Sequence, residues 1–453
     1  MTQSAPLDAS PDTPTGPAAR TPVQARRAAW AGFAGTFVEY YDFALYGVLT
    51  VFFAPQFFPA ANPATSLLAG LAVFGAGFVS RPLGGILFGR IGDRYGRRPA
   101  LVSTLVLMGL CSGLVGLLPT YASIGVWAPV LLVLLRLGQG ISAGSELLGS
   151  VTFVLESAPK SKRIFLASMT PFGASLGTAA ATASVWALSS SAGGDWMSDY
   201  GWRLLFLLGF PLTAVALWIR SGISESPEFK AESADGGPVK SPLRELFRKH
   251  RRVALLAGGV AIAANGTSGL IAWFSTYLVG TRDLPEGTVF AALAIGSLIA
   301  APTVLVSGLL TERHGQLRVT SVILGALVLG ALPFLWLLGT ATELPALLGT
   351  LVVYNILGVC LMPPAYTLIA QLFPVSVRYT GATFGQNIGN VLGAGVAPFV
   401  GAQLAVGTGS ALGPAIWIVG VAVVGLVALS AIRTSGASAP QERGPAARQD
   451  SRV

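Results

Sequence analysis

Charged side chains are scarce in this sequence. Asp, Glu, Lys and Arg together make up 11% of its 453 residues, whereas they account for about 25% of an ordinary soluble domain. Hydrophobic residues make up 53%, and the mean hydropathy is +0.67. This balance excludes a set of soluble domains. It predicts an all-α membrane protein, because apolar stretches of about twenty residues cross a bilayer as helices.

Cysteine and histidine are nearly absent as well, with two of each. Cys111 and Cys360 lie inside apolar runs, and His250 and His314 lie in polar connections between such runs. The sequence shows no metal-ligand spacing, no pairing of a nucleophile with a base and no phosphate-cradling loop. We therefore expect neither an enzyme nor a bound cofactor.

Apolar runs predict twelve membrane spans, at about 28–54, 65–89, 99–119, 127–155, 164–189, 202–220, 253–279, 286–310, 317–339, 344–372, 379–404 and 411–433. One long polar connection divides them into two halves of six. We expect a disordered cytoplasmic N-tail (1–27), a six-helix bundle (28–220), a central cytoplasmic loop (221–252), a second six-helix bundle (253–433) and a disordered cytoplasmic C-tail (434–453).

The central loop contains two local signals. Gly236, Gly237 and Pro238 predict a flexible joint. Residues 243–252 are basic and amphipathic. They fit either a helix lying on the anionic inner leaflet or a solvated topological anchor.

The net charge of +9 does not indicate a nucleic-acid partner, because the basic residues form short clusters between spans and no soluble domain carries a basic face. When alternate loops are assigned to the cytoplasm, 25 of the 29 Lys and Arg fall on that side. The exceptions are Arg81, Arg136, Arg203 and Arg282. The positive-inside rule then places both termini in the cytoplasm of a bacterial-type plasma membrane.

Acidic side chains interrupt the first apolar run. Glu39 and Asp42 share one helix face, and Tyr46 lies one turn further along it. A carboxylate inside a span costs several kcal/mol unless it is paired, protonated or facing water. We expect these three side chains to face a cavity. Asp42 and Glu39 are candidates for proton coupling, and structural pairing is the alternative for each.

A segment recurs at matching positions in the two halves. Gly89–Arg98 follows the second span and Gly308–Leu317 follows the eighth, with glycine, acid, arginine and glycine at the same offsets. Two such repeats are typical of transporters that rock two halves about a site near the bilayer midplane.

These motifs resemble those of the major facilitator superfamily, and within it the metabolite:proton symporter family. The Gly89–Arg98 segment is similar to the superfamily's loop signature. Glu39–Phe43 resembles the family's Glu-Trp-Tyr-Asp-Phe, and Arg81–Gly85, Glu225–Phe229 and Phe373–Gly381 also resemble family segments. The resemblance covers nearly all of residues 28–433. It implies twelve transmembrane helices in two six-helix pseudo-repeats, the major facilitator fold.

The resemblance also implies roles for individual residues. Arg136 begins a segment similar to a superfamily motif linked to proton transfer. Asp93, Arg97 and Arg98 belong to the loop signature and are expected to form a conformational latch. Asp93 can cap a helix N-terminus across the interface between halves, while the arginines engage an acid such as Glu156.

For substrate binding, one hypothesis is that Arg81 binds a carboxylate through its planar guanidinium, and its rival is an Arg81–Glu146 ion pair. The aromatic residues Tyr46, Trp273 and Tyr277 could line the cavity and accommodate a cationic group, although the last two also fit an interfacial belt. The second half offers buried amides in place of charges, among them Asn265, Asn355, Gln386, Asn387 and Asn390.

One departure concerns the fourth span. Family members usually carry Gly-Gly-Glu-x-Gly-Gly there, whereas this chain has Gly144-Ser145-Glu146-Leu147-Leu148-Gly149. The substrate of any one family member therefore does not transfer to this chain.

The sequence as a whole predicts a monomeric, proton-coupled symporter in the lipid bilayer that imports a small organic acid or zwitterion by alternating access. The alternative is a proton antiporter exporting a drug-like or secondary-metabolite compound. A non-transporting solute sensor is a more remote alternative, because no sizeable output segment is present.

Overall fold

The computed structural model describes residues 22–61, 63–192, 196–226, 229 and 242–435, and every regular element in these ranges is helical. The first half consists of α1 (Pro22–Phe57), α2 (Pro63–Arg94), α3 (Arg97–Leu117), α4 (Tyr121–Ile124), α5 (Trp127–Ser157), α6 (Arg163–Ala167), α7 (Met169–Ala192), η1 (Met197–Gly201), α9 (Trp202–Leu207) and α10 (Gly209–Ser221).

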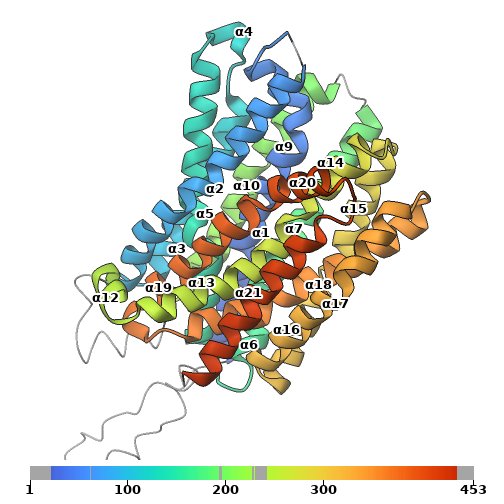
Figure 1. Cartoon of the computed structure of the whole chain (residues 1–453). Helices are drawn as coiled ribbons and strands as arrows, with labels where there is room; N and C mark the ends of the chain where they lie inside the picture. The colour runs from blue at the N-terminus through green and yellow to red at the C-terminus, as the bar shows by residue number, and fades with distance from the viewer. Residues whose placement is uncertain (1–21, 62, 193–195, 227–228, 230–241, 436–453) are drawn as a thin grey trace, which may run out of the picture.

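The second half repeats this pattern after a short helix, α12 (Pro242–Lys249). It consists of α13 (Arg251–Gly269), α14 (Ile271–Gly280), α15 (Glu286–Ala300), α16 (Thr303–His314), α17 (Gln316–Thr340), α18 (Leu344–Gln371), η2 (Val375–Val377), α19 (Arg378–Gly389), η3 (Asn390–Gly395), α20 (Ala397–Thr408) and α21 (Ala415–Thr434). The two halves lie side by side as one elongated bundle, with α4 at one end and α6 and α12 at the other (Figure 1). We call the end that carries α6 and α12 the latch end.

Ten of the predicted spans recur among the described residues as helical stretches long and apolar enough to cross a membrane. The other two correspond to α1, which carries Glu39 and Asp42, and to α13 and α14, which are separated at Leu270. Several predicted spans are broken helices, as is common where backbone lines an internal site. The chain is therefore a multi-pass membrane protein.

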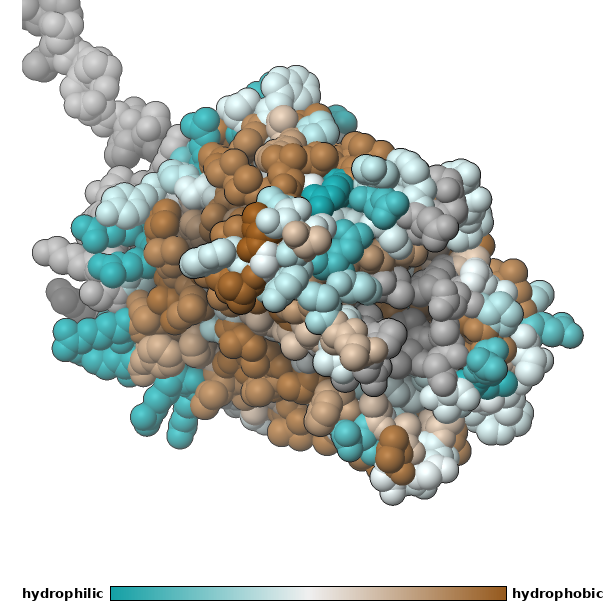
Figure 2. Space-filling view, turned by 90° about the horizontal axis from the view of Figure 1, so that it is seen from above, coloured by the Kyte–Doolittle hydropathy of each residue, from teal (hydrophilic) through white to brown (hydrophobic). Residues whose placement is uncertain are grey.

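The outer surface is rich in exposed apolar side chains, which show as brown areas in Figure 2. Leu329 is 81% exposed, Val406 79% and Trp218 76%. Such exposure disfavours folding in water but suits a surface that contacts lipid tails.

The predicted segment boundaries need one correction. Residues 22–27 were expected in a disordered tail, but α1 begins at Pro22, because proline is well suited to the first turn of a helix. Residues 1–21 and 436–453 of the two predicted tails lie outside the described residues, as do Gly236, Gly237 and Pro238, while α21 extends to Thr434. Of the basic segment at 243–252, residues 242–249 form α12, whose Leu246 is fully buried against protein.

Candidate functional site

Close approach of α2 and α5 positions the buried charges. A Cβ added to Gly84 would overlap the carbonyl of Ile141, and a Cβ added to Gly144 would overlap the carbonyl of Arg81. Small residues let two membrane helices pack this closely. As a result Arg81 on α2 and Arg136 on α5 both face α1, where Glu39 and Asp42 lie one turn apart.

Asp42 and Arg136 form a buried pair whose carboxylate is fully hydrogen bonded. Asp42 Oδ2 lies 3.5 Å from Arg136 Nη1. The Ser112 hydroxyl donates to Asp42 Oδ1 at 2.6 Å, and the Gln139 amide donates to Oδ1 at 2.9 Å and to Oδ2 at 2.8 Å. Structural pairing, the alternative given for Asp42, is therefore present, with Arg136 as its partner.

Glu39 and Arg81 form a second pair, whose carboxylate is much less satisfied than that of Asp42. Arg81 Nη2 lies 3.5 Å from Glu39 Oε1. Within the described part of the chain, neither Glu39 oxygen nor Arg81 Nε has a hydrogen-bond partner, although all three atoms are buried. Leaving buried polar groups unsatisfied is unfavourable by several kcal/mol in total. This pair therefore retains capacity to bind another polar group.

The Phe43 ring lies between the two pairs. Its centroid is 4.3 Å from Cζ of Arg81 and 4.1 Å from Cζ of Arg136. A guanidinium over an aromatic face is attracted by the ring quadrupole. Phe43 thus holds both arginines and keeps the two ion pairs apart.

The second half contributes a polar cluster opposite the Glu39–Arg81 pair. The Tyr366 hydroxyl on α18 and the Gln386 amide on α19 both donate to Asn265 Oδ1 on α13, at 3.3 and 3.2 Å. Tyr366 also interacts electrostatically with Glu39 and Arg81. We call Glu39, Arg81, Asn265, Tyr366 and Gln386 the central cluster. The sequence indicated its amides, but Tyr366 was missed because a tyrosine in an apolar span is common.

The latch contacts join the two halves at the latch end. Asp93 accepts hydrogen bonds from the backbone N–H of Thr380 at 2.9 Å and of Tyr379 at 3.3 Å, at the N-terminus of α19. Arg97 donates to Asp93 Oδ1 at 2.7 Å and to both Glu156 oxygens at 3.2 Å. The predicted helix cap across the interface and the Arg97–Glu156 contact are both confirmed.

Two details of the latch differ from the prediction. Arg98 does not reach Glu156. Its side chain donates to the Ser221 carbonyl at 3.4 Å in an exposed position, because successive residues of a helix point in different directions. Glu156 instead receives a second arginine from the other half, since Arg378 Nη1 lies 3.3 Å from Glu156 Oε1.

The second repeat makes an equivalent cap. Glu312 at the end of α16 accepts from the backbone N–H of Ile164 at 2.8 Å and of Phe165 at 2.9 Å, at the start of α6. Each half therefore places an acid on the N-terminus of a helix of the other half, where the helix dipole favours negative charge. The matching offsets of the two repeats were the signal for this contact.

The predicted Arg81–Glu146 pair does not form. Glu146 instead pairs with Arg220 of α10, and it accepts from Thr104 at 2.6 Å and from Ser150 at 3.1 Å. Arg220, at the end of the sixth predicted span, was expected among the basic residues on the cytoplasmic side, but it is fully buried because its side chain reaches back toward α1 and α3. Glu146 is thus paired inside the first half.

Other predicted binding residues also lie outside the central cluster. Tyr46 is fully buried, donates to the Gly70 carbonyl at 3.4 Å and covers Arg136. Trp273 and Tyr277 stack on each other on α14, with ring centroids 4.8 Å apart. Asn387 joins the halves by donating to the Gly144 carbonyl at 2.6 Å. Of the six predicted substrate-binding side chains, the structure brings only Arg81 to the cluster.

Two repeated six-helix halves, a polar cluster between them and a latch at one end define a secondary membrane transporter. The chain belongs to the Major Facilitator Superfamily, whose model matches residues 32–398.

Relatives and solved structures agree with this assignment. The shikimate transporter of Escherichia coli strain K12 is 35% identical over 391 residues, covering 84% of this chain and 88% of the relative. The proline/betaine transporter of Salmonella typhimurium strain LT2 is 33% identical over 417 residues, covering 89% and 82%. The predicted resemblance to metabolite:proton symporters is confirmed, and the chain is a transporter and not an enzyme.

A solved structure of the proton:xylose symporter XylE bound to 6-bromo-6-deoxy-D-glucose superposes with a TM-score of 0.72, at 17% identity, covering 91% of this chain and 96% of that chain. The human organic anion transporter MFSD10 superposes with a TM-score of 0.62, at 18% identity, covering 89% and 99%. These two likenesses establish the predicted fold.

Proposed function

We propose that this transporter is a proton-coupled symporter that imports a small organic acid or zwitterion. It lies in the plasma membrane with both termini in the cytoplasm, as the distribution of Lys and Arg favours. The observation that carries the proposal is the contrast between the two buried carboxylates. The Asp42 carboxylate accepts three hydrogen bonds, whereas neither Glu39 oxygen has a hydrogen-bond partner among the described residues.

Asp42 is the proposed proton carrier. Its carboxylate is balanced by Arg136 inside the first half. Protonation removes that negative charge and leaves the guanidinium with Gln139, at 3.0 Å, and aromatic rings as neighbours. Breaking one side of a buried pair changes the relative free energies of the conformations that contain it, so proton binding and conformation become linked.

Glu39 and Arg81 form the proposed substrate site. The Arg81 guanidinium suits a carboxylate, and the unsatisfied Glu39 oxygens suit a cationic or hydroxyl group on the same molecule. Shikimate, proline and betaine, which name two of the relatives, each carry a carboxylate. The second half contributes Tyr366, Asn265 and Gln386 to this site. A bound substrate therefore contacts both halves.

Transport then follows from rocking of the halves. Opening the latch end requires release of the two helix caps at Asp93 and Glu312, and closing it restores them. Substrate held between the halves is exposed to alternate sides as these contacts break and form.

Uptake into proteoliposomes tests the proposal. A labelled panel of dicarboxylates, keto acids, aromatic acids and betaines is supplied with an inward proton gradient, with and without a protonophore. We expect accumulation of at least one carboxylate or zwitterion, accompanied by proton influx, and its loss with the protonophore. Proton movement opposite to substrate would instead identify an antiporter and contradict the proposal.

A further inference from the structure

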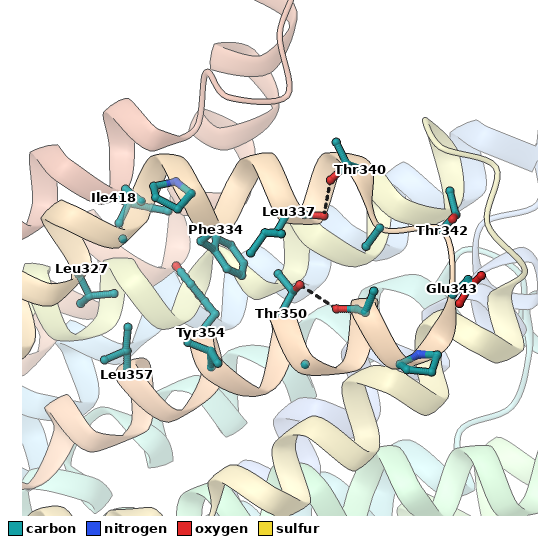
Figure 3. A pocket seen from close by; sticks show the side chains of 18 residues that line it. Leu327, Phe334, Leu337, Thr340, Thr342, Glu343, Thr350, Tyr354, Leu357 and Ile418 are labelled. Carbon is teal, nitrogen blue, oxygen red and sulfur yellow. Dashed lines mark hydrogen bonds between the residues drawn. The ribbon is translucent and has the colours of Figure 1, made fainter.

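A cavity that shares no lining residue with the central cluster lies along α17 and α18, next to Ile418 of α21 (Figure 3). Its volume is about 740 Å³, and every residue that lines it belongs to the second half. We call this cavity the α17–α18 groove. None of its lining residues belongs to the central cluster or to the latch contacts described above.

The groove is apolar along most of its length. Phe334 and Tyr354 form its floor, with stacked rings whose centroids are 4.4 Å apart, while Leu337 and Val353 are exposed along its sides. The Tyr354 hydroxyl donates away from the groove to the Thr267 carbonyl at 2.8 Å. A ligand along this part of the groove would therefore meet almost only carbon atoms.

Polar groups gather at one end. Thr340, Thr342 and Glu343 lie there, while Leu327, Leu357 and Ile418 lie at the other end (Figure 3). The polar end is the short connection between α17, which ends at Thr340, and α18, which begins at Leu344. Connections between spans lie at the membrane surface, so the apolar end points into the bilayer.

Charged side chains lie at and beside the polar end. Glu343 lines the groove, whereas Arg282 lies next to it and is not a lining residue. Glu343 is exposed. Arg282 donates from Nη1 to the carbonyls of Leu338 at 3.0 Å and Ala341 at 2.6 Å, and Ala341 lines the groove. An anion in the lining of an apolar groove and a cation beside it complement a zwitterionic headgroup attached to a hydrocarbon tail.

We propose that the groove binds one phospholipid with an ethanolamine headgroup. Its ammonium group lies at Glu343, its phosphate at Arg282, and an acyl chain extends over Phe334 and Tyr354 toward Leu357. The distance along α18 from Glu343 to Leu357 is about 21 Å by helical rise. One leaflet of the hydrocarbon core is about 15 Å thick, so a single tail has room to lie at full length.

Two glycines make the proposal testable without disturbing the fold. Gly330 on α17 and Gly349 on α18 both line the groove, and a Cβ added to either meets no atom within 4 Å. Gly330→Leu and Gly349→Leu therefore fill the groove. Gly325→Leu is a matched control, because Gly325 is on α17, has the same free space and does not line the groove.

The experiment is native mass spectrometry of the purified full chain titrated with dioleoyl phosphatidylethanolamine or dioleoyl phosphatidylglycerol. We expect the wild type and Gly325→Leu to retain one ethanolamine lipid, and Gly330→Leu and Gly349→Leu to bind it at least tenfold more weakly. Glu343→Gln should remove most of the preference for ethanolamine over glycerol headgroups while leaving overall lipid binding.

Three outcomes would overturn the proposal. Equal lipid retention in the filled and control variants would show that bound lipid lies elsewhere. Loss of a dimer in the filled variants, with lipid retention unchanged, would make the groove an interface between two copies. An unchanged headgroup preference in Glu343→Gln would remove the role of the charged end. Equal melting temperatures of Gly330→Leu and Gly325→Leu confirm that the comparison is between folded proteins.

Discussion

At the residue scale, neighbouring acids on one helix have different surroundings. Asp42 accepts three hydrogen bonds in addition to its arginine, and Glu39 accepts none from the described residues. The difference arises from the helices that each acid faces. Asp42 faces Ser112 and Gln139 in the first half, whereas Glu39 faces the boundary with the second half. The Asp42 oxygens are thus already occupied by protein groups, whereas the Glu39 oxygens remain available to bind a ligand.

Arg81→Lys tests the substrate role. A lysine keeps the charge but loses the planar fork that binds a carboxylate through two parallel bonds. We expect substrate affinity to fall at least tenfold, which corresponds to about 1.4 kcal/mol, with proton coupling of the remaining transport retained. Counterflow across a range of substrate concentrations measures this. Arg90→Lys, on an exposed face of the same helix, is the control. Equal affinities in the two variants would remove Arg81 from the site.

Glu146→Gln tests a structural role. It leaves the fully buried Arg220 without its counter-charge, and breaking a buried pair on one side destabilises a protein by about 3–5 kcal/mol. We expect a clear fall in the melting temperature, partly recovered in the double variant Glu146→Gln, Arg220→Met. Glu245→Gln, which removes the exposed pair with Lys249, should change stability by less than about 1 kcal/mol. Similar melting curves for all variants would contradict the structural role.

At the element scale, each half closes the latch end by capping a helix of the other half. The two caps lie at the starts of α19 and α6. They hold helix ends rather than side chains, so they set the positions of whole helices. The short helix α12 adds to this closure, because Phe247 packs edge to face on Phe384 of α19, with ring centroids 5.1 Å apart. Its basic residues Arg244, Arg248 and Lys249 remain exposed.

Asp93→Ala tests the latch. Removing the cap leaves the first N–H groups of α19 without their carboxylate and Arg97 with one fewer partner. We expect the equilibrium to shift toward conformations open at the latch end. A cysteine placed at the buried Thr383 should then react several-fold faster with a membrane-impermeant thiol reagent from that side. Asp199→Ala, an exposed acid in η1, is the control, and an unchanged labelling rate in Asp93→Ala would contradict the latch.

At the scale of the whole molecule, the fold followed largely from the sequence. The length and spacing of apolar runs predicted the spans, and the Gly89–Arg98 repeat predicted the contact between halves. These signals are local in the chain. The partners of the buried charges could not be predicted, because they depend on how each helix is rotated about its axis. Arg220 illustrates this: its position at the end of a span suggested a loop, but its side chain turns inward to Glu146.

Only part of the central cluster could be predicted from the sequence, because its other members depend on how the helices are placed and rotated. Glu39 and Arg81 are recognisable because charge is rare in a span. Tyr366 is recognisable only once α18 is placed opposite α1 and α2. Trp273 and Tyr277 stack on each other on α14, outside the central cluster, and their predicted binding role stays a prediction.

The most direct test of the account compares accumulation with exchange in Asp42→Asn. Asparagine keeps hydrogen bonds to Ser112 and Gln139 possible but cannot carry a proton. In proteoliposomes, we predict that this variant loses uphill accumulation and substrate-driven proton influx while retaining counterflow of a substrate identified by the uptake panel. Glu39→Gln should instead weaken substrate binding. Accumulation by Asp42→Asn at the wild-type level would show that the proton is carried elsewhere and would contradict the division of roles between the two pairs.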